Sequence, residues 1–180
     1  MTNSHLYVMC GFPCSGKSFI AKGLANDHGF TRFSTDDLRK MMFGVEDYMA
    51  YEQSPDYNEK EYVVGQTIQN GKMAALFAGQ NVVIDASSTY EEWRQIYFDT
   101  GIVGQGGMQV PKTLIYVKTD WDLIRERNLR KGRDGNVVST WQERWEEPQT
   151  GQGYDICECS GDDIGEWIKA MSAIGKRFSQ

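Results

Sequence analysis

Long apolar runs are missing from this sequence of 180 residues. No stretch approaches the roughly 18 apolar residues that a membrane-spanning helix requires. The first residues, Met1–His5, also lack the basic and apolar regions of a signal peptide. We therefore expect a cytoplasmic protein without a membrane segment.

Cysteine is scarce as well. Only Cys10, Cys14, Cys157 and Cys159 occur, and this number predicts reduced thiols rather than a disulfide framework. The close pair Cys157 and Cys159 has neither a second cysteine pair nor a histidine cluster at a suitable spacing. The sequence therefore argues against a structural metal site.

The sequence also lacks an excess of positive charge, because it has 19 basic and 25 acidic residues and a net charge of −6. Proteins bind long nucleic-acid duplexes mainly by neutralising phosphates with many cations. The composition argues against that activity, whereas a local basic cleft would be enough for a strand end or a small molecule. With 40% hydrophobic and 12% aromatic residues, we expect one globular domain over residues 1–180.

The most informative segment is residues 11–18, Gly-Phe-Pro-Cys-Ser-Gly-Lys-Ser, which fits the phosphate-binding P-loop pattern. A strand-like apolar segment precedes it and a helical pattern follows it, as the motif requires. Lys17 would reach the terminal phosphates, and the hydroxyl of Ser18 suits a Mg²⁺ ligand. The predicted nucleotide contacts of this segment are Gly11, Cys14, Ser15, Gly16, Lys17, Ser18 and Phe19.

A carboxylate pair follows the short strand predicted at Phe30–Ser34. In open α/β sheets ligands gather at the carboxyl ends of strands, so Asp36 is placed to accept a proton from an attacking hydroxyl. Arg39 lies on the same face of a helix and would hold an anionic group of the acceptor. The alternative is that Thr35 or Asp36 only caps the helix predicted at Leu38–Phe43.

The acidic, tyrosine-rich segment Gly44–Tyr62 is interpreted as a solvated helical linker rather than as a flap whose rings stack on a base. A buried strand is predicted at Val82–Asp85, and its final carboxylate, Asp85, would hold Mg²⁺ at the substrate side of the sheet. On the next helix, Arg94 is a candidate contact to the acceptor. The alternative for Arg94 is a surface charge near an acidic neighbour.

The densest positive charge follows the helix start at Thr119–Asp122. It comprises Arg125, Arg127, Arg130, Lys131 and Arg133. We predict a lid at about residues 125–138, in which Arg130 offsets the charge of the transferred phosphoryl group and Arg127, Lys131 and Arg133 contact the nucleotide. The alternative is a solvated helix face.

The remaining pattern alternates strands with helices. Further helices are predicted at residues 18–26, 59–79, 91–98 and 139–146, further strands at 112–117 and 154–159, and a flexible connection at 101–107. The last helix would run to Phe178 and face the core with Ile164, Trp167, Ile168 and Met171. This order predicts a three-layer α/β sandwich with a five-stranded parallel sheet and a helical lid.

Over residues 5–160 the chain resembles the polynucleotide-kinase-like P-loop kinases. The P-loop form, the carboxylates with Arg39, the strand that ends in Asp85 and the Arg127-Asn128 lid segment carry this resemblance. It departs from the family at Cys14 and at Ser139, where the lid pattern usually has a proline. The resemblance implies transfer of the γ-phosphate of ATP to a hydroxyl, with Asp36 as general base and Arg39 at a phosphate of the acceptor.

Three functions follow as hypotheses. The first is an ATP- and Mg²⁺-dependent kinase of a hydroxyl on a nucleic acid end or a nucleotide-like acceptor, most typically a polynucleotide 5′-hydroxyl. The second is a kinase of a hydroxymethylated base in DNA, a nucleoside or another small molecule, because fold and P-loop do not distinguish acceptors. The third, from another class, is an ATP-hydrolysing nucleotide switch.

Overall fold

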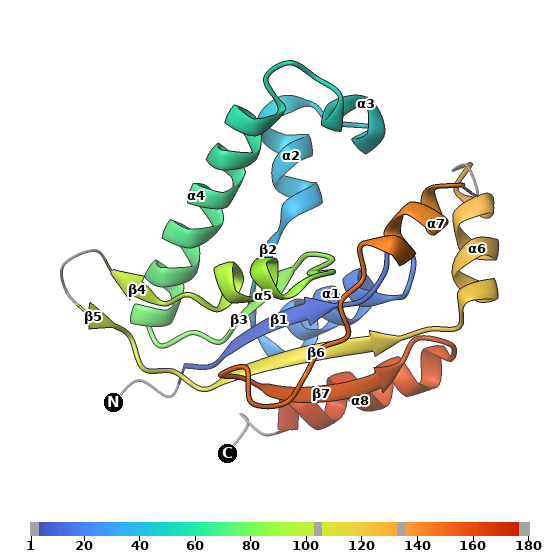
Figure 1. Cartoon of the computed structure of the whole chain (residues 1–180). Helices are drawn as coiled ribbons and strands as arrows, with labels where there is room; N and C mark the ends of the chain where they lie inside the picture. Colours follow the sequence, from blue (N-terminus) through green and yellow to red (C-terminus); the bar gives the residue numbers. More distant parts are fainter. Residues whose placement is uncertain (1–3, 103–105, 133–135, 177–180) are drawn as a thin grey trace.

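The computed structural model describes residues 4–102, 106–132 and 136–176, and its centre is a parallel sheet of five strands (Figure 1). The strand order is β2-β3-β1-β6-β7. Their bounds are β1 (Leu6–Cys10), β2 (Thr31–Ser34), β3 (Val82–Asp85), β6 (Lys112–Lys118) and β7 (Asp155–Ser160). This sheet confirms the predicted fold class.

The helices connect these strands as the alternation predicts. They are α1 (Lys17–His28), α2 (Thr35–Phe43), α3 (Tyr48–Glu52), α4 (Tyr57–Phe77), α5 (Glu91–Phe98), α6 (Trp121–Arg130), α7 (Asn136–Glu143) and α8 (Ile164–Lys176). None of the described helices is long and apolar enough to cross a bilayer.

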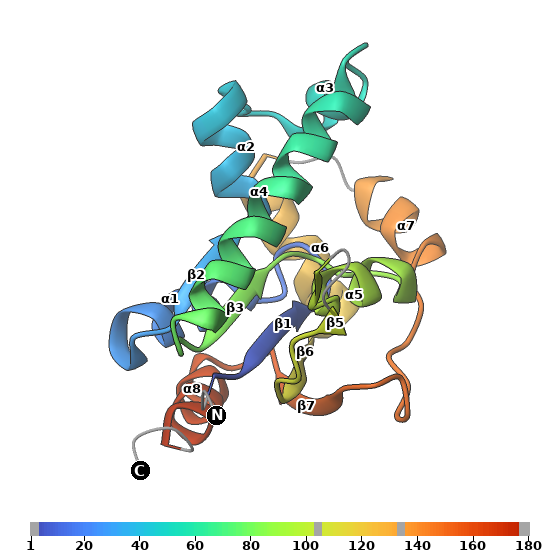
Figure 2. The ribbon, with the colours of Figure 1, turned by 90° about the vertical axis from the view of Figure 1, so that its left-hand side faces the viewer.

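The alternation of side chains on β1 explains the layers. Leu6, Val8 and Cys10 belong to the core that the sheet forms with α4 and α5. Tyr7 and Met9 point to the opposite face and pack in the core formed with α1 and α8. Figure 2 shows α4 and α8 on opposite sides of the sheet, which gives the three layers.

Two groups of helices extend beyond the sheet. Figure 1 shows α2, α3 and the first half of α4 standing away from it on one side, and α6 with α7 on the other. We call α2, α3 and the whole of α4, residues 35–77, the α2–α4 lobe. β2 and β3 pair with Ser34 opposite Asp85, so the start of this lobe meets the carboxyl end of β3.

Two segments differ from the sequence-based expectation, and a third agrees with it. The connection expected to be flexible at 101–107 contains an antiparallel pair, β4 (Gly101–Ile102) and β5 (Gly106–Gly107). The segment Gly44–Tyr62, interpreted as a helical linker, forms α3 and the start of α4, and Tyr51 is buried there. The helix expected at 139–146 is α7, which ends at Glu143, since Trp145 beyond it packs against Phe12 at a ring distance of 4.4 Å.

The core face of α8 also differs from the prediction. Met171 and Ile174 are buried, but Ile168 is 51% exposed. The side chain of Ile164 lies outside the described ones. Trp167 is half-buried because its ring lies against the loop between β1 and α1, not only against the sheet.

Candidate active site

The phosphate-binding loop joins β1 to α1 in a conformation that needs its glycines. Gly11 and Gly16 have φ values of 142° and 110°, which L side chains rarely adopt. A Cβ atom on Gly16 would also lie only 2.5 Å from Cζ2 of Trp167. Cys14 takes a left-handed φ of 67° without being a glycine. The loop leads directly into the first turn of α1, and a helix N-terminus after such a loop favours an anion.

Lys17 is held inside the loop. Its side chain is buried, and its Nζ donates a hydrogen bond to the carbonyl oxygen of Phe12 at 2.6 Å. Burial lowers the pKa of Lys17 from its ordinary value, and the nearby charge of Asp85 opposes that shift. A bound phosphate would add negative charge beside this ammonium group and favour its charged form.

Ser18 and Asp85 meet at the carboxyl end of the sheet. The hydroxyl of Ser18 donates to Oδ1 of Asp85 at 3.1 Å, and Asp85 is buried. Both residues were predicted to lie at a metal. The structure places their oxygen atoms together, and their contact with a metal stays a prediction.

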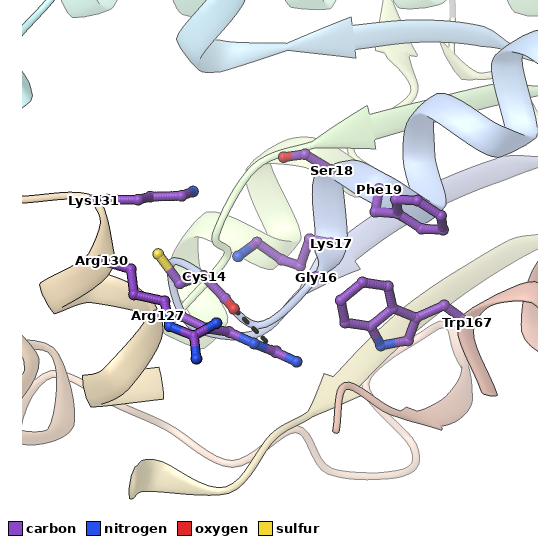
Figure 3. Close-up of a pocket in the computed structure, with 9 residues that line it drawn as sticks. All are labelled: Cys14, Gly16, Lys17, Ser18, Phe19, Arg127, Arg130, Lys131 and Trp167. Atoms are coloured by element: carbon purple, nitrogen blue, oxygen red, sulfur yellow. Dashed lines mark hydrogen bonds between the residues drawn. The ribbon is translucent and has the colours of Figure 1, made fainter. Parts of the chain in front are cut away.

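A cavity of about 380 Å³ opens beside the loop (Figure 3). Its lining residues are Cys14, Gly16, Lys17, Ser18, Phe19, Arg127, Arg130, Lys131 and Trp167. Eight of these nine were predicted from the sequence as contacts to the nucleotide or to the transferred phosphate. The structure thus brings the loop and the cationic end of α6 to one cavity, and their contacts to a nucleotide stay a prediction.

Trp167 is the lining residue that sequence reasoning missed. Its ring centroid lies 5.2 Å from that of Phe19, and the guanidinium carbon of Arg127 lies 5.2 Å from the indole centroid. Arg127 also donates to the carbonyls of Cys14 and Gly161, at 3.3 and 2.8 Å. Aromatic rings and guanidinium groups both stack on flat bases, so this corner of the cavity suits a purine.

The other cations of α6 are more exposed. Arg130 is paired with Glu126 one turn earlier, and its side chain is 75% exposed. Lys131 is exposed and forms no ion pair with a residue that the structure describes. Arg133 lies outside the described residues. Arg127 is therefore fixed against the loop, whereas Arg130 and Lys131 keep their ends at the solvent side of the cavity.

Asp36 lies in the first turn of α2, where its side chain is 82% exposed and accepts a hydrogen bond from Arg39 at 2.9 Å. Arg39 donates through Nε and NH2 to both oxygens of Glu61, at 2.8 and 2.7 Å. The guanidinium group is thus bound by two carboxylates. The predicted contact between Arg39 and a phosphate of the acceptor stays a prediction.

The cap of α2 is different from the expected one. Neither Thr35 nor Asp36 caps the helix, because the hydroxyl of Ser34 accepts from the amide of Asp37 at 3.2 Å. The first turn of α2 is therefore stabilised without the carboxylate of Asp36, which leaves that carboxylate available at the surface.

Arg32 connects this turn to Asp85, which the sequence did not predict. Its Nε and NH2 donate to Oδ2 of Asp85 at 3.0 and 2.5 Å. Its NH1 donates to Asp37 at 2.6 Å. A sequence signal existed, because Arg32 precedes Ser34 by two residues and therefore shares its side of the strand.

Arg94 is fully buried. It donates to Glu91 at 2.8 Å and to the carbonyl oxygens of Ser88 and Glu146 at 3.2 and 2.9 Å. It thereby joins the loop after β3 to the segment after α7. Its predicted contact with an acceptor would require the side chain to leave this position. The amide of Glu91, at the start of α5, donates to the carboxylate of Glu146 at 2.8 Å.

Comparisons with known proteins agree with this architecture. Residues 6–148 match the family model described as AAA domain. A search of curated proteins found no match. Among solved structures, the fold is similar to a gluconokinase from Sinorhizobium meliloti 1021, with a TM-score of 0.60, 16% identity, and coverage of 99% of this chain and 97% of that one.

Two further structures are similar. A putative kinase from Chloroflexus aurantiacus J-10-fl has a TM-score of 0.69 and 13% identity, with 99% of this chain and 98% of that one covered. The shikimate kinase from Aquifex aeolicus VF5 has a TM-score of 0.56 and 15% identity, with 97% and 96% covered. Identities at this level establish a shared fold.

Proposed function

Since the chain belongs to the AAA domain family, we propose that it is an ATP-dependent kinase that transfers the γ-phosphate to a hydroxyl group of a small molecule. The observation that carries this proposal is a direct connection between the phosphate-binding site and the acceptor side. Arg32 bonds Asp85, the partner of Ser18, and also Asp37, the neighbour of Asp36. The proposed donor site and the proposed general base, Asp36, would thus lie close together at the carboxyl ends of the strands.

The chemistry follows from these positions. Asp36 would accept the proton of the attacking hydroxyl, and Arg39 keeps its carboxylate oriented. Lys17 and the loop amides would bind the phosphates of ATP. Arg130 and Lys131, at the solvent side of the cavity, would offset the charge that spreads over the transferred phosphoryl group.

The oxygen atoms at the end of β3 fit Mg²⁺. Ser18 supplies a hydroxyl and Asp85 a carboxylate within 3.1 Å of each other, and Mg²⁺ prefers such hard oxygen donors. These two residues would hold the ion, directly or through water. When bound, its charge would offset that of the phosphates.

A small acceptor fits better than a polynucleotide. Of the three lysines of the α2–α4 lobe, Lys40 is paired with Glu46, Lys60 is paired with Asp56, and Lys72 is buried. The lobe therefore offers little free positive charge to a polyanion. The names of two similar structures, gluconokinase and shikimate kinase, also point to small acceptors. This supports the small-molecule hypothesis over the polynucleotide 5′-hydroxyl that the sequence resemblance implies.

An acceptor panel with radiolabelled ATP tests the proposal. It should contain polyols, sugars, gluconate, shikimate, nucleosides and an oligonucleotide with a 5′-hydroxyl. We expect a small molecule to be phosphorylated with a KM that salt does not change. Phosphorylation of the oligonucleotide with a salt-dependent KM would establish the nucleic acid hypothesis instead. ATP hydrolysis that no acceptor increases would establish the nucleotide switch.

The substitution Asp36→Asn tests the base. We expect kcat to fall by about 10² to 10⁴ while MgATP binding is kept, because the amide cannot take the proton. Glu46→Gln is the matched control, since it removes an equal charge from the same lobe at an exposed position. Full activity of Asp36→Asn would show that another group is the base.

A further inference from the structure

Arg32 places a full positive charge on the carboxylate that faces the phosphate-binding loop. Its side chain is 14% exposed and that of Asp85 is 3% exposed, so water screens this ion pair poorly. Two nitrogens of Arg32 donate to the same oxygen, Oδ2, at 3.0 and 2.5 Å. The Ser18 hydroxyl donates to the other oxygen, Oδ1. Both oxygens of Asp85 are therefore bound by protein donors.

The third nitrogen of Arg32 fixes this arrangement. NH1 donates to Asp37 at 2.6 Å, and Asp37 belongs to the first turn of α2. Arg32 is thus held from two elements, and all three of its nitrogens are bound. A guanidinium group held in this way is pre-organised, so its positive charge stays beside Asp85.

The charge balance of the metal site follows. With Arg32 in place, Asp85 offers a divalent cation a carboxylate whose charge is already compensated, beside the buried ammonium group of Lys17. In the absence of nucleotide, the electrostatic attraction of a divalent cation to this site would therefore be weak. The phosphates of a nucleotide would supply the missing negative charge.

We propose that Arg32 is a positioning residue that neutralises Asp85 and makes divalent-cation binding at this carboxylate depend on a bound nucleotide. The inference rests on the proposed nucleotide and metal site, but it is independent of the acceptor. Arg32 would also keep Oδ1 directed at Ser18, since Oδ2 is held from the opposite side. The site would then load metal and nucleotide together.

Mn²⁺ is the probe, because the electron paramagnetic resonance signal of free Mn²⁺ reports binding without any turnover. In the absence of nucleotide, we expect the wild type and Asp85→Asn to bind Mn²⁺ equally weakly. With ADP present, we expect the wild type to bind Mn²⁺ about tenfold or more tightly than Asp85→Asn does. Weaker binding by Asp85→Asn without nucleotide would overturn the inference, and this comparison needs no change at Arg32.

The substitution Arg32→Gln keeps a hydrogen-bond donor near Asp85 but removes the charge. We expect it to bind Mn²⁺ without nucleotide about tenfold or more tightly than the wild type, and Arg32→Gln/Asp85→Asn to lose that gain. Arg32→Lys should resemble the wild type, since it keeps the charge. Lys22→Gln, an exposed position on α1, controls for net charge.

Other outcomes distinguish the two proposals. An Arg32→Gln variant that binds Mn²⁺ no better than the wild type, or an Arg32→Lys variant that binds as tightly as Arg32→Gln, would overturn the role of the charge. Equal Mn²⁺ binding by the wild type and Asp85→Asn with ADP would remove Asp85 from the metal site, and the inference with it. A failed acceptor panel would instead count against the kinase and leave these results unaffected.

Discussion

Trp167 lines the cavity beside the phosphate-binding loop. Its indole contacts Phe19 on one side and the guanidinium group of Arg127 on another, beside the phosphate-binding loop. Among the residues that the structure describes, its Nε1 is buried without a hydrogen-bond partner. Because one side of the ring borders the cavity, we propose that it stacks on a bound base.

The substitution Trp167→Leu should therefore weaken the binding of MgADP by about tenfold, since stacking on an aromatic ring contributes about 1–3 kcal/mol. Calorimetric titration measures this. Inorganic tripolyphosphate should bind both proteins alike, because it lacks a base. Ile168→Ala, at an exposed position of α8, controls for damage to the helix. Equal affinity of Trp167→Leu and the wild type for MgADP would exclude a stacking role.

The role of a single residue can be predicted when the residues that it contacts lie close to it along the chain. The loop residues 11–19 could be predicted because one short motif contains both the glycines and the phosphate contacts. Asp85 could be predicted from its place at the end of an apolar strand. Trp167 and Arg32 could not, because their roles depend on the packing of α8 against the loop and on the pairing of β2 with β3. The alternation along β2 places Arg32 on the side of Ser34, but no local pattern identifies Asp85 as its partner or places Trp167 at the loop.

Lys72 joins two elements on one face of the sheet. It lies on α4, it is fully buried, and its Nζ donates to the carbonyl oxygens of Tyr97 and Asp99 at 2.9 and 2.5 Å. These carbonyls belong to the last turn of α5 and to its C-cap residue, where a cation is favourable. Burial lowers the pKa of Lys72 to about 8.

The substitution Lys72→Met should change how stability depends on pH. Between about pH 8 and the ordinary lysine pKa, the unfolded chain binds a proton at Lys72 that the folded chain has released. The free energy of unfolding of the wild type should therefore rise with pH relative to Lys72→Met, by up to about 1.4 kcal/mol per pH unit. Denaturant unfolding of both proteins at pH 7, 8, 9 and 10 measures the difference between their free energies of unfolding. The contributions of the other titratable groups cancel, because both proteins share them.

Lys22→Met, at an exposed position of α1, is the matched control and should show a constant difference from the wild type over this range. A constant difference for Lys72→Met as well would mean that Lys72 keeps its ordinary pKa in the folded protein. The carbonyl oxygens around the buried ammonium group would then compensate fully for its loss of water.

Elements were predictable where hydrophobic periodicity alone determines them. The strand Val82–Asp85 and the helix Glu91–Phe98 have the predicted bounds. The short elements were not predictable, because tertiary contacts decide them. α3 forms around the buried ring of Tyr51, and α7 ends where Trp145 turns toward Phe12. Propensity carries little information over so few residues.

At the scale of the whole molecule, one sheet edge supports three parts of the proposed site. The loop after β1 carries the predicted phosphate contacts, the α2–α4 lobe carries Asp36, and α6 carries the cations of the predicted lid. Arg32 bonds the first two parts through Asp85 and Asp37. A hydrophobic core on each face of the sheet connects the strands to their helices. The single domain predicted for residues 1–180 should therefore unfold as one cooperative unit.

Thermal unfolding with and without MgADP tests this expectation. We expect one transition, seen alike by circular dichroism and by tryptophan fluorescence, since the tryptophans are distributed over α5, α6, α7, α8 and the segment after α7. At about 100 times its dissociation constant, MgADP should add about 2.7 kcal/mol of stability. That gain raises Tm by roughly 5–10 °C in a chain of this length.

Lys17→Ala should unfold in one transition as well, but its Tm should change little with MgADP, because the buried ammonium group of the loop is missing. Two separate transitions in the wild type, of which MgADP shifts only one, would contradict the single domain. They would mean that the α2–α4 lobe unfolds independently of the sheet, so that the bonds of Arg32 are too weak to couple the two.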